Sequence, residues 1–266
     1  EPKRIITRFS VRQKQLTNVA AGTAATDAVN LQQLQDVAAV AEATDRYFQA
    51  SGSDASDAGA SVDGDNALAA GEAANAIGDG TVALGSGANA LDTNATAVGG
   101  DALASGIDAA ALGYNAQASG ESSTALGTNS AASGYAATAG GAGAVASGDG
   151  SLAQGALAQA DGIEGTALGY YSTASGEGAT AVGAESIADG ETAAALGFAA
   201  EATADYATAV GGYAQASGFN STAVGNFAGA TGSNSVALGS DSEASGAYST
   251  ATGQGSVASG TNSVAL

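Results

Sequence analysis

The chain has 266 residues, of which 41 are glycine and none is cysteine, histidine, methionine or tryptophan. It therefore has no disulfide and no nucleophile or metal cluster built on Cys or His. The net charge is −20, and all six basic residues lie within the first 46 positions. Because the remainder carries only acidic charges, it repels nucleic acid and anionic lipid, and we expect no nucleic-acid partner.

The part of the chain before position 64 differs in pattern from the rest. Residues 1–15 are basic and irregular with a β-prone run, and we interpret them as the end of an upstream element. Thr26 or Asp27 is placed to cap a helix that runs to about Tyr47. Leu31 and Leu34 begin a spacing close to a heptad, but two heptads are too few to establish a coiled coil. Residues 49–63 are a polar transition.

Residues 64–266 form one repeat array. From Gly64 to Gly260 every seventh residue is glycine, except at Asp92 and Ala204, and between the glycines alanine recurs with the same period. An insertion would shift this phase, so the array is continuous. Regular glycines disfavour a helix, and a collagen strand needs a period of three. Short strands joined by glycine turns fit the pattern, and we expect the glycines to adopt left-handed turn conformations.

Two half-units alternate within this array, so the true repeat is twice the glycine spacing. The residue before the glycine is apolar in one half-unit, as at Leu238, and mostly polar in the next, as at Ser245. Alternate residues of a strand face opposite sides. Pairs of alanine and serine are therefore expected inside a narrow roll, with one apolar and one polar outer face. The predicted fold class is all-β, a parallel β-roll (solenoid) of 14-residue coils.

The apolar face predicts an interface. A roll this thin has little core, and an apolar stripe along its whole length needs a cover, for which further copies of the chain are the simplest choice. We predict that the residues of this stripe line an interface between copies: Val82, Leu84, Val98, Leu112, Leu126, Leu168, Val182, Leu196, Val210, Val224, Val236 and Leu238.

The array resembles the head of the trimeric autotransporter adhesins, the YadA-like surface proteins of Gram-negative bacteria. The resemblance lies in residues 234–239 and 262–266 and in the Ala-x-Gly half-units between them. Residues 16–48 resemble the neck and the short coiled-coil stalk of this family, and residues 64–266 its head. The neck residues that match are Asn18, Val19, Gly22, Asp27, Val29, Asn30 and Leu34.

The resemblance implies a left-handed parallel β-roll with three chains in each head, a homotrimer. It also implies display on the cell surface, with an outer-membrane anchor at the C-terminus of the full protein that this segment lacks. The function that it implies is attachment to host matrix, to host cells or to other bacteria. The chain lacks an initiator methionine and stops at Leu266, one residue before the next expected glycine, so we expect a piece of a longer protein.

Some residues depart from the family pattern. Gly140, Gln154 and Thr252 stand where leucine or valine is usual, and Asp92 replaces a turn glycine. Here a neck precedes the head, whereas a neck normally follows one. An upstream head or a similar β-domain is therefore expected before residue 1.

We find no motif for catalysis or for a cofactor. The serines and aspartates follow the repeat instead of converging on one site. Asp63-Gly64-Asp65 lacks the further ligands of a calcium loop, and residues 140–143 resemble only the start of a calcium-binding nonapeptide. The sequence thus predicts a protein that is not an enzyme and that has no metal site and no cofactor.

Aromatic residues of the array all follow a turn by one or two positions. They either brace neighbouring chains or coils, or contact a surface ligand, and the predicted contact residues are Tyr170, Tyr171, Phe198, Tyr213 and Phe227. Two functions remain: an adhesive head, or a passive rigid spacer that holds a more distal head away from the membrane. An ice-binding roll is a third and more remote interpretation, based on a line of threonines on the apolar face.

Overall fold

The computed structural model describes residues 17–45 and 58–266. The chain divides into two compact units, Glu1–Ala50 and Ser51–Leu266, which we describe separately. The predicted upstream element at residues 1–15 lies outside the described residues, as do residues 49–57 of the predicted transition.

A loop and one helix make up the described part of the first unit. Helix α1 spans Leu31–Asp45. Asn30 caps this helix: its Oδ1 accepts a hydrogen bond from Gln33 N at 3.0 Å, and Gln33 Oε1 accepts one from Asn30 N at 3.2 Å. The prediction that Thr26 or Asp27 caps the helix was wrong. Asp27 instead closes the loop before the helix, because its carboxylate accepts hydrogen bonds from the backbone of Thr23 and Ala24.

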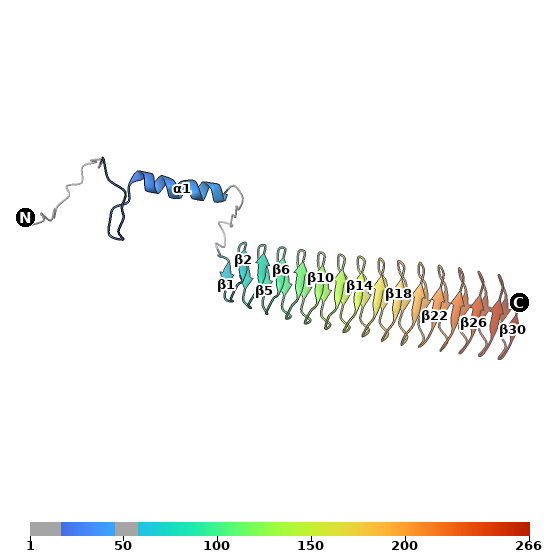
Figure 1. Ribbon diagram of the computed structural model, residues 1–266. Coiled ribbons are helices and arrows are strands. Elements are labelled where there is room, and N and C mark those ends of the chain that lie inside the picture. The colour runs from blue at the N-terminus through green and yellow to red at the C-terminus, as the bar shows by residue number, and fades with distance from the viewer. Residues whose placement is uncertain (1–16, 46–57) are drawn as a thin grey trace, which may run out of the picture. The chain divides into compact units, whose positions relative to one another are not determined.

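The second unit is a parallel β-solenoid of two 15-stranded sheets, with turns along two opposite edges (Figure 1). The first sheet consists of the even-numbered strands β2 (Leu68–Ala70), β4 (Val82–Leu84), β6 (Thr96–Val98), β8 (Ala110–Leu112), β10 (Thr124–Leu126), β12 (Thr138–Gly140), β14 (Leu152–Gln154), β16 (Thr166–Leu168), β18 (Thr180–Val182), β20 (Ala194–Leu196), β22 (Thr208–Val210), β24 (Thr222–Val224), β26 (Val236–Leu238), β28 (Thr250–Thr252) and β30 (Val264–Ala265). The second sheet consists of the odd-numbered strands β1 (Ser61–Val62), β3 (Asn75–Ala76), β5 (Asn89–Ala90), β7 (Leu103–Ala104), β9 (Gln117–Ala118), β11 (Ala131–Ala132), β13 (Val145–Ala146), β15 (Gln159–Ala160), β17 (Thr173–Ala174), β19 (Ile187–Ala188), β21 (Glu201–Ala202), β23 (Gln215–Ala216), β25 (Gly229–Ala230), β27 (Glu243–Ala244) and β29 (Val257–Ala258).

Each strand pairs in parallel with the strand one coil further on. Thr124 pairs with Thr138, and Leu126 with Gly140, so the register equals one full repeat of the sequence. The predicted period and fold class are confirmed. Strand β1 lies just before Gly64, the first glycine of the array.

The interior is filled by alanine and serine, as the alternation predicts. Ala125 and Ser123 are fully buried, and the same two positions are buried in coil after coil. Small side chains are required here because only the width of one coil separates the two sheets.

The turns correct one prediction. The residue two positions after each repeated glycine has a left-handed φ, as in Asn115 (φ 52°) and Tyr213 (φ 56°), and most of these residues are not glycine. The repeated glycines serve a different purpose. A Cβ placed on Gly85 would lie 2.5 Å from the carbonyl oxygen of Gly99, one coil further on. Glycine is needed because successive turns stack backbone on backbone.

The two edges differ in backbone conformation. We call the turns after the first-sheet strands the first ridge (71–73, 85–87 and every fourteenth residue to 253–255) and those after the second-sheet strands the second ridge (64–66, 78–80 and onward to 260–262). Every repeated glycine of the first ridge has positive φ, as at Gly85 (133°), but no repeated glycine of the second ridge does. The two exceptions to the glycine rule, Asp92 and Ala204, lie on the second ridge, where a side chain meets a steric clash but no φ strain.

Candidate functional site

An apolar row runs along the outer side of the first sheet. Pairing in register aligns its residues, as for Leu112 with Leu126 and for Val210 with Val224. In the single chain they are partly exposed, and Leu126, the most exposed of them, reaches 42%. The predicted interface residues therefore do share one face. Gly140 and Gln154 interrupt the row at neighbouring strands, and Thr252 interrupts it once more.

The outer side of the second sheet is more polar, with hydrogen bonds between side chains of successive coils. Gln215 Nε2 donates to Glu201 Oε2 at 3.2 Å, and the Ser147 hydroxyl is bonded to the Asp161 carboxylate. The sheet is less uniform than the sequence analysis implied. Ile77 and Leu91 are exposed on its first coils, at 46% and 37%.

On the first ridge, the ring of Tyr213 contacts those of Phe198 and Phe227 on the coils before and after it. The rings of Tyr213 and Phe227 are stacked, with centroids 4.9 Å apart and planes at 1°. Phe198 meets Tyr213 edge to face at 5.3 Å and 79°. Tyr170 and Tyr171 form a separate pair at 5.6 Å. All five side chains are between 45% and 56% exposed, so a ligand or a second chain has access to them.

The second ridge carries an aromatic pair that the sequence analysis did not single out. Tyr206 and Phe219 meet edge to face at 5.6 Å. The Tyr206 hydroxyl donates to Glu191 Oε1 at 3.1 Å. This hydrogen bond and the charge of Glu191 raise the pKa of Tyr206. In sequence, the two aromatic residues are separated by one residue less than a full coil. Tyr206 lies two residues after its turn position and Phe219 only one residue after its own, so a search for aromatic pairs spaced by one coil does not find them.

Carboxylates in the array bond to backbone and to polar side chains. Asp149 Oδ1 accepts from Tyr135 N at 2.9 Å, and Asp205 Oδ1 accepts from Glu191 N at 3.0 Å, each across one coil. Residues 58–266 contain no lysine or arginine. The acidic surface of this part of the chain is therefore not neutralised by its own residues.

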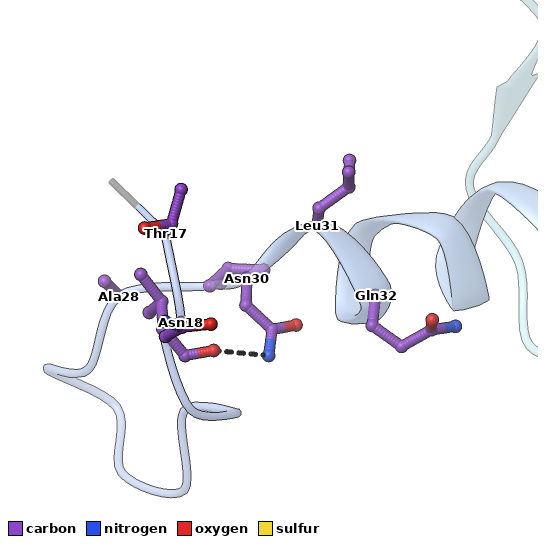
Figure 2. A pocket seen from close by; sticks show the side chains of 8 residues that line it. Thr17, Asn18, Ala28, Asn30, Leu31 and Gln32 are labelled. Atoms are coloured by element: carbon purple, nitrogen blue, oxygen red, sulfur yellow. Dashed lines mark hydrogen bonds between the residues drawn. The ribbon is translucent and has the colours of Figure 1, made fainter. Parts of the chain in front are cut away.

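The neck loop is closed by side-chain hydrogen bonds to the backbone (Figure 2). Asn30 Nδ2 donates to Val19 O at 3.2 Å. Gln33 bridges the loop to the helix: its Oε1 accepts from Gly22 N at 2.9 Å, and its Nε2 donates to Gly22 O at 3.1 Å. Two backbone hydrogen bonds hold the pKa of Asp27 below its ordinary value. A shallow pocket beside these contacts is lined by Thr17, Asn18, Val19, Ala28, Val29, Asn30, Leu31 and Gln32.

Apolar side chains of the neck and helix stay exposed in the single chain. Val29 is 70% exposed, and Leu31, Leu34 and Val37 are between 60% and 68% exposed. No described residue of the chain covers them. An apolar helix face of this kind is typical of a helix that packs against other helices. Among the described residues, no helix has the length and hydrophobicity of a membrane span.

These features define a class of protein. It is a repetitive β-solenoid whose first sheet has an apolar outer face, and in the sequence a neck and a helix with an exposed apolar face come before it. Comparison with known families identifies the particular one. The family described as the coiled stalk of trimeric autotransporter adhesin matches residues 15–57. The YadA head domain repeat matches residues 63–88, 76–102, 104–130, 146–171, 160–186, 188–214, 216–242 and 244–266.

The matches extend over most of the chain, which belongs to the YadA-like trimeric autotransporter adhesins. Its family consists of non-enzymatic adhesins that are displayed at the cell surface. Among solved structures, the chain is similar to the collagen-binding domain of the Yersinia adhesin YadA, with 29% identity and a TM-score of 0.36. That match covers 55% of this chain and 66% of the Yersinia chain, so just under two thirds of the latter is spanned. No curated protein sequence matches.

Proposed function

We propose that this segment is a homotrimeric head, with residues 64–266 as the head and 16–48 as the neck and stalk, and that it attaches the bacterium to matrix or to cell surfaces. The observation that carries the adhesive role is the exposed aromatic stack of Phe198, Tyr213 and Phe227 on the first ridge. Aromatic anchors are common hot spots of protein interfaces.

Trimer formation follows from the apolar row. Burial of each leucine or valine is worth on the order of 1.5–3 kcal/mol, whereas a monomer leaves the row in water. We propose as interface the row residues Val82, Leu84, Val98, Leu112, Leu126, Leu168, Val182, Leu196, Val210, Val224, Val236 and Leu238. Their exposed fractions in the single chain support this assignment.

The ligand contact proposed here is the first-ridge set of Tyr170, Tyr171, Phe198, Tyr213 and Phe227. Three copies in a trimer present the set three times, which raises avidity for a repetitive or immobilised ligand. Because the array carries acidic groups and no basic ones, a ligand with basic groups associates faster, and more so at low salt. A cationic matrix segment fits this chemistry, and the outer membrane of a Gram-negative bacterium is the proposed site of anchoring.

A second candidate is a rigid spacer that carries a more distal head. The regularity of the solenoid favours it, since two 15-stranded sheets in unbroken register build a stiff element. The position of the neck before the head also favours it. In that case the aromatic residues brace the trimer and the segment itself contacts no ligand.

The test uses the trimer, an array of matrix proteins (collagen among them) and glycans, and binding to whole cells. The variant is Tyr213→Ala with Phe227→Ala, and the control is Tyr248→Ala, which removes an exposed ring at a turn of the other ridge. We expect the double variant to lose adhesion while it still sediments as a trimer. Unchanged adhesion with lower thermal stability would show that the stack is structural and favour the spacer. No change in either would remove this ridge as the site.

A further inference from the structure

The aromatic clusters of the two ridges occupy the same coils. Phe198, Tyr213 and Phe227 lie on the first ridge, while Tyr206 and Phe219 lie on the second. Figure 1 shows that the turns of the solenoid form two opposite edges. The two clusters are therefore at one level along the solenoid but on opposite sides of it, and they do not touch within one chain.

Large apolar and aromatic residues of the two ridges also lie at equal levels elsewhere along the solenoid. Each leucine, phenylalanine or tyrosine of the first ridge lies within eight positions, about half a coil, of an isoleucine, phenylalanine or tyrosine of the second. Tyr114 is matched by Ile107, and Leu157, Tyr170 and Tyr171 share Ile163. Between these levels the first ridge carries only small, polar or acidic residues.

The second ridge also has two tyrosines without a counterpart. Tyr135 and Tyr248 are exposed by 57% and 63%, and the first ridge has only small or polar residues at their levels. They serve as internal controls, because they share the ridge and the turn geometry of Tyr206 and Phe219 but not the match.

Threefold symmetry brings matched levels together. In a closed ring of identical chains, one edge of each copy meets the opposite edge of the next. If the first sheets face the axis, the first ridge of one copy meets the second ridge of its neighbour. A rotation adds no shift along the axis, so residues at equal levels come side by side.

We propose that the Phe198–Tyr213–Phe227 stack of one copy and the Tyr206–Phe219 pair of the neighbouring copy form one aromatic seam between subunits. This inference rests on the homotrimer of the proposed function. The occupant of each cluster is thus a second copy of the chain, and the ligand contact proposed above is made by two copies at once. The seam also selects the register, because a shift by several coils places rings against acidic turns.

Cross-linking tests the seam directly, since the chain has no cysteine of its own. The pair Asn220→Cys and Asn226→Cys puts one thiol on each ridge beside the rings and leaves all five rings in place. Both asparagines are exposed, and Asn220 already has φ 52° without being glycine, so cysteine adds no new backbone strain. We expect a short bismaleimide to convert the full chain into a covalent trimer on a denaturing gel.

Two controls fix the interpretation. Each single-cysteine variant has a thiol on only one ridge, and we expect it to stay monomeric on the gel. The pair Asn94→Cys with Asn226→Cys also spans both ridges, but its thiols lie nine coils apart and should not link. As an independent measurement, Tyr206→Ala should lower the melting temperature of the trimer, while Tyr248→Ala should leave it unchanged.

The outcomes separate the seam from the proposed function. No cross-link in a protein that sediments as a trimer overturns the seam, and the adhesive role of the first ridge then stands or falls on its own test. A monomer in sedimentation refutes the trimer and the seam together. A cross-linked trimer whose Tyr213→Ala/Phe227→Ala variant still adheres keeps the seam and removes the ligand contact.

Discussion

A Cβ placed on Gly176 would lie 2.0 Å from the carbonyl oxygen of Gly190, the glycine one coil further on. No side chain fits at that distance unless the turns move apart. Since Gly176 has no positive φ, the clash is the whole cost of a side chain there. Ala204 occupies an equivalent position on the second ridge, so the turns do yield when they must.

The first prediction is a graded series of glycine substitutions. Gly176→Ala should destabilise the solenoid by about 1–3 kcal/mol through overpacking. Gly239→Ala should cost more, because Gly239 combines a φ of 135° with a backbone contact at 2.7 Å. Gly229→Ala is the control: its nearest atom is 4.0 Å away and it has no positive φ, so it should stabilise by about 0.4–1 kcal/mol. Guanidinium unfolding measures all three, and equal stabilities would refute this account of the glycine period.

The second prediction compares two buried serines that look alike in sequence. Ser242 Oγ donates to Gly239 O at 2.8 Å, whereas Ser235 Oγ is buried without a partner. Ser242→Ala should therefore cost about 0.5–1.5 kcal/mol, and Ser235→Ala should be neutral or stabilising. Thermal unfolding of both variants checks this. A larger loss at Ser235 than at Ser242 would mean that its hydroxyl has a partner in the assembled protein.

The solenoid was predictable because its period forces one answer. Alanine at every seventh position, with serine or alanine two residues earlier except at Thr81 and Gly165, leaves only a narrow interior, and alternation then assigns the outer faces. A spacing of one full coil likewise predicts contact between Tyr213 and Phe227, which the stacked rings confirm. The Tyr206–Phe219 pair escaped because its spacing falls one position short of a coil, although the turn geometry still brings the rings together.

Local hydrogen bonding was harder to predict. Several residues before the helix are able to cap it, and the preferences of their side chains do not distinguish them. The structure selects Asn30, because Asn30 and Gln33 also hold the neck loop through Val19 and Gly22. The turns were misjudged for a related reason. The left-handed residue of each turn donates its backbone N–H to a carbonyl of the preceding coil, as Tyr213 does to Phe198. This contact joins successive repeats, so the pattern within one repeat does not reveal it.

The third prediction concerns the helix cap. Asn30→Ala removes the acceptor for Gln33 N and the donor to Val19 O, and should cost the helix about 1 kcal/mol. Faster amide hydrogen exchange in the first turn of α1 is the measurement. Gln35→Ala, an exposed change in the next turn, should leave exchange unchanged or slow it, because alanine favours a helix. Equal exchange in the two variants would contradict the assignment of the cap.

The fourth prediction is a dependence on pH. The Asp27 carboxylate accepts hydrogen bonds from Thr23 N at 2.8 Å and Ala24 N at 2.9 Å, which lowers its pKa. A lowered pKa means that the carboxylate stabilises the loop above its ordinary pKa, and that this stability is lost as the pH falls through the lower, folded value. The amide NMR shifts of Thr23 and Ala24 should titrate together with this midpoint. In Asp27→Asn the titration should disappear; if it persists, another group controls the loop.

The last prediction tests the interface. Leu126 is 42% exposed in the single chain and lies in the apolar row of the first sheet, whereas Ser119 is exposed on the second sheet. In the proposed trimer, Leu126→Asp would replace a buried leucine with a charge and bring three carboxylates close to one another. The substitution loses on the order of 1.5–3 kcal/mol of stabilisation by apolar burial for each chain, and the unpaired charges add to the loss.

Ser119→Asp is the control, because it places the same charge in water and should change stability by less than about 0.5 kcal/mol. Analytical ultracentrifugation and thermal unfolding should show a dissociated or much less stable Leu126→Asp protein beside a normal Ser119→Asp trimer. Equal behaviour of the two, or a parent chain that is monomeric at micromolar concentration, would place the interface elsewhere.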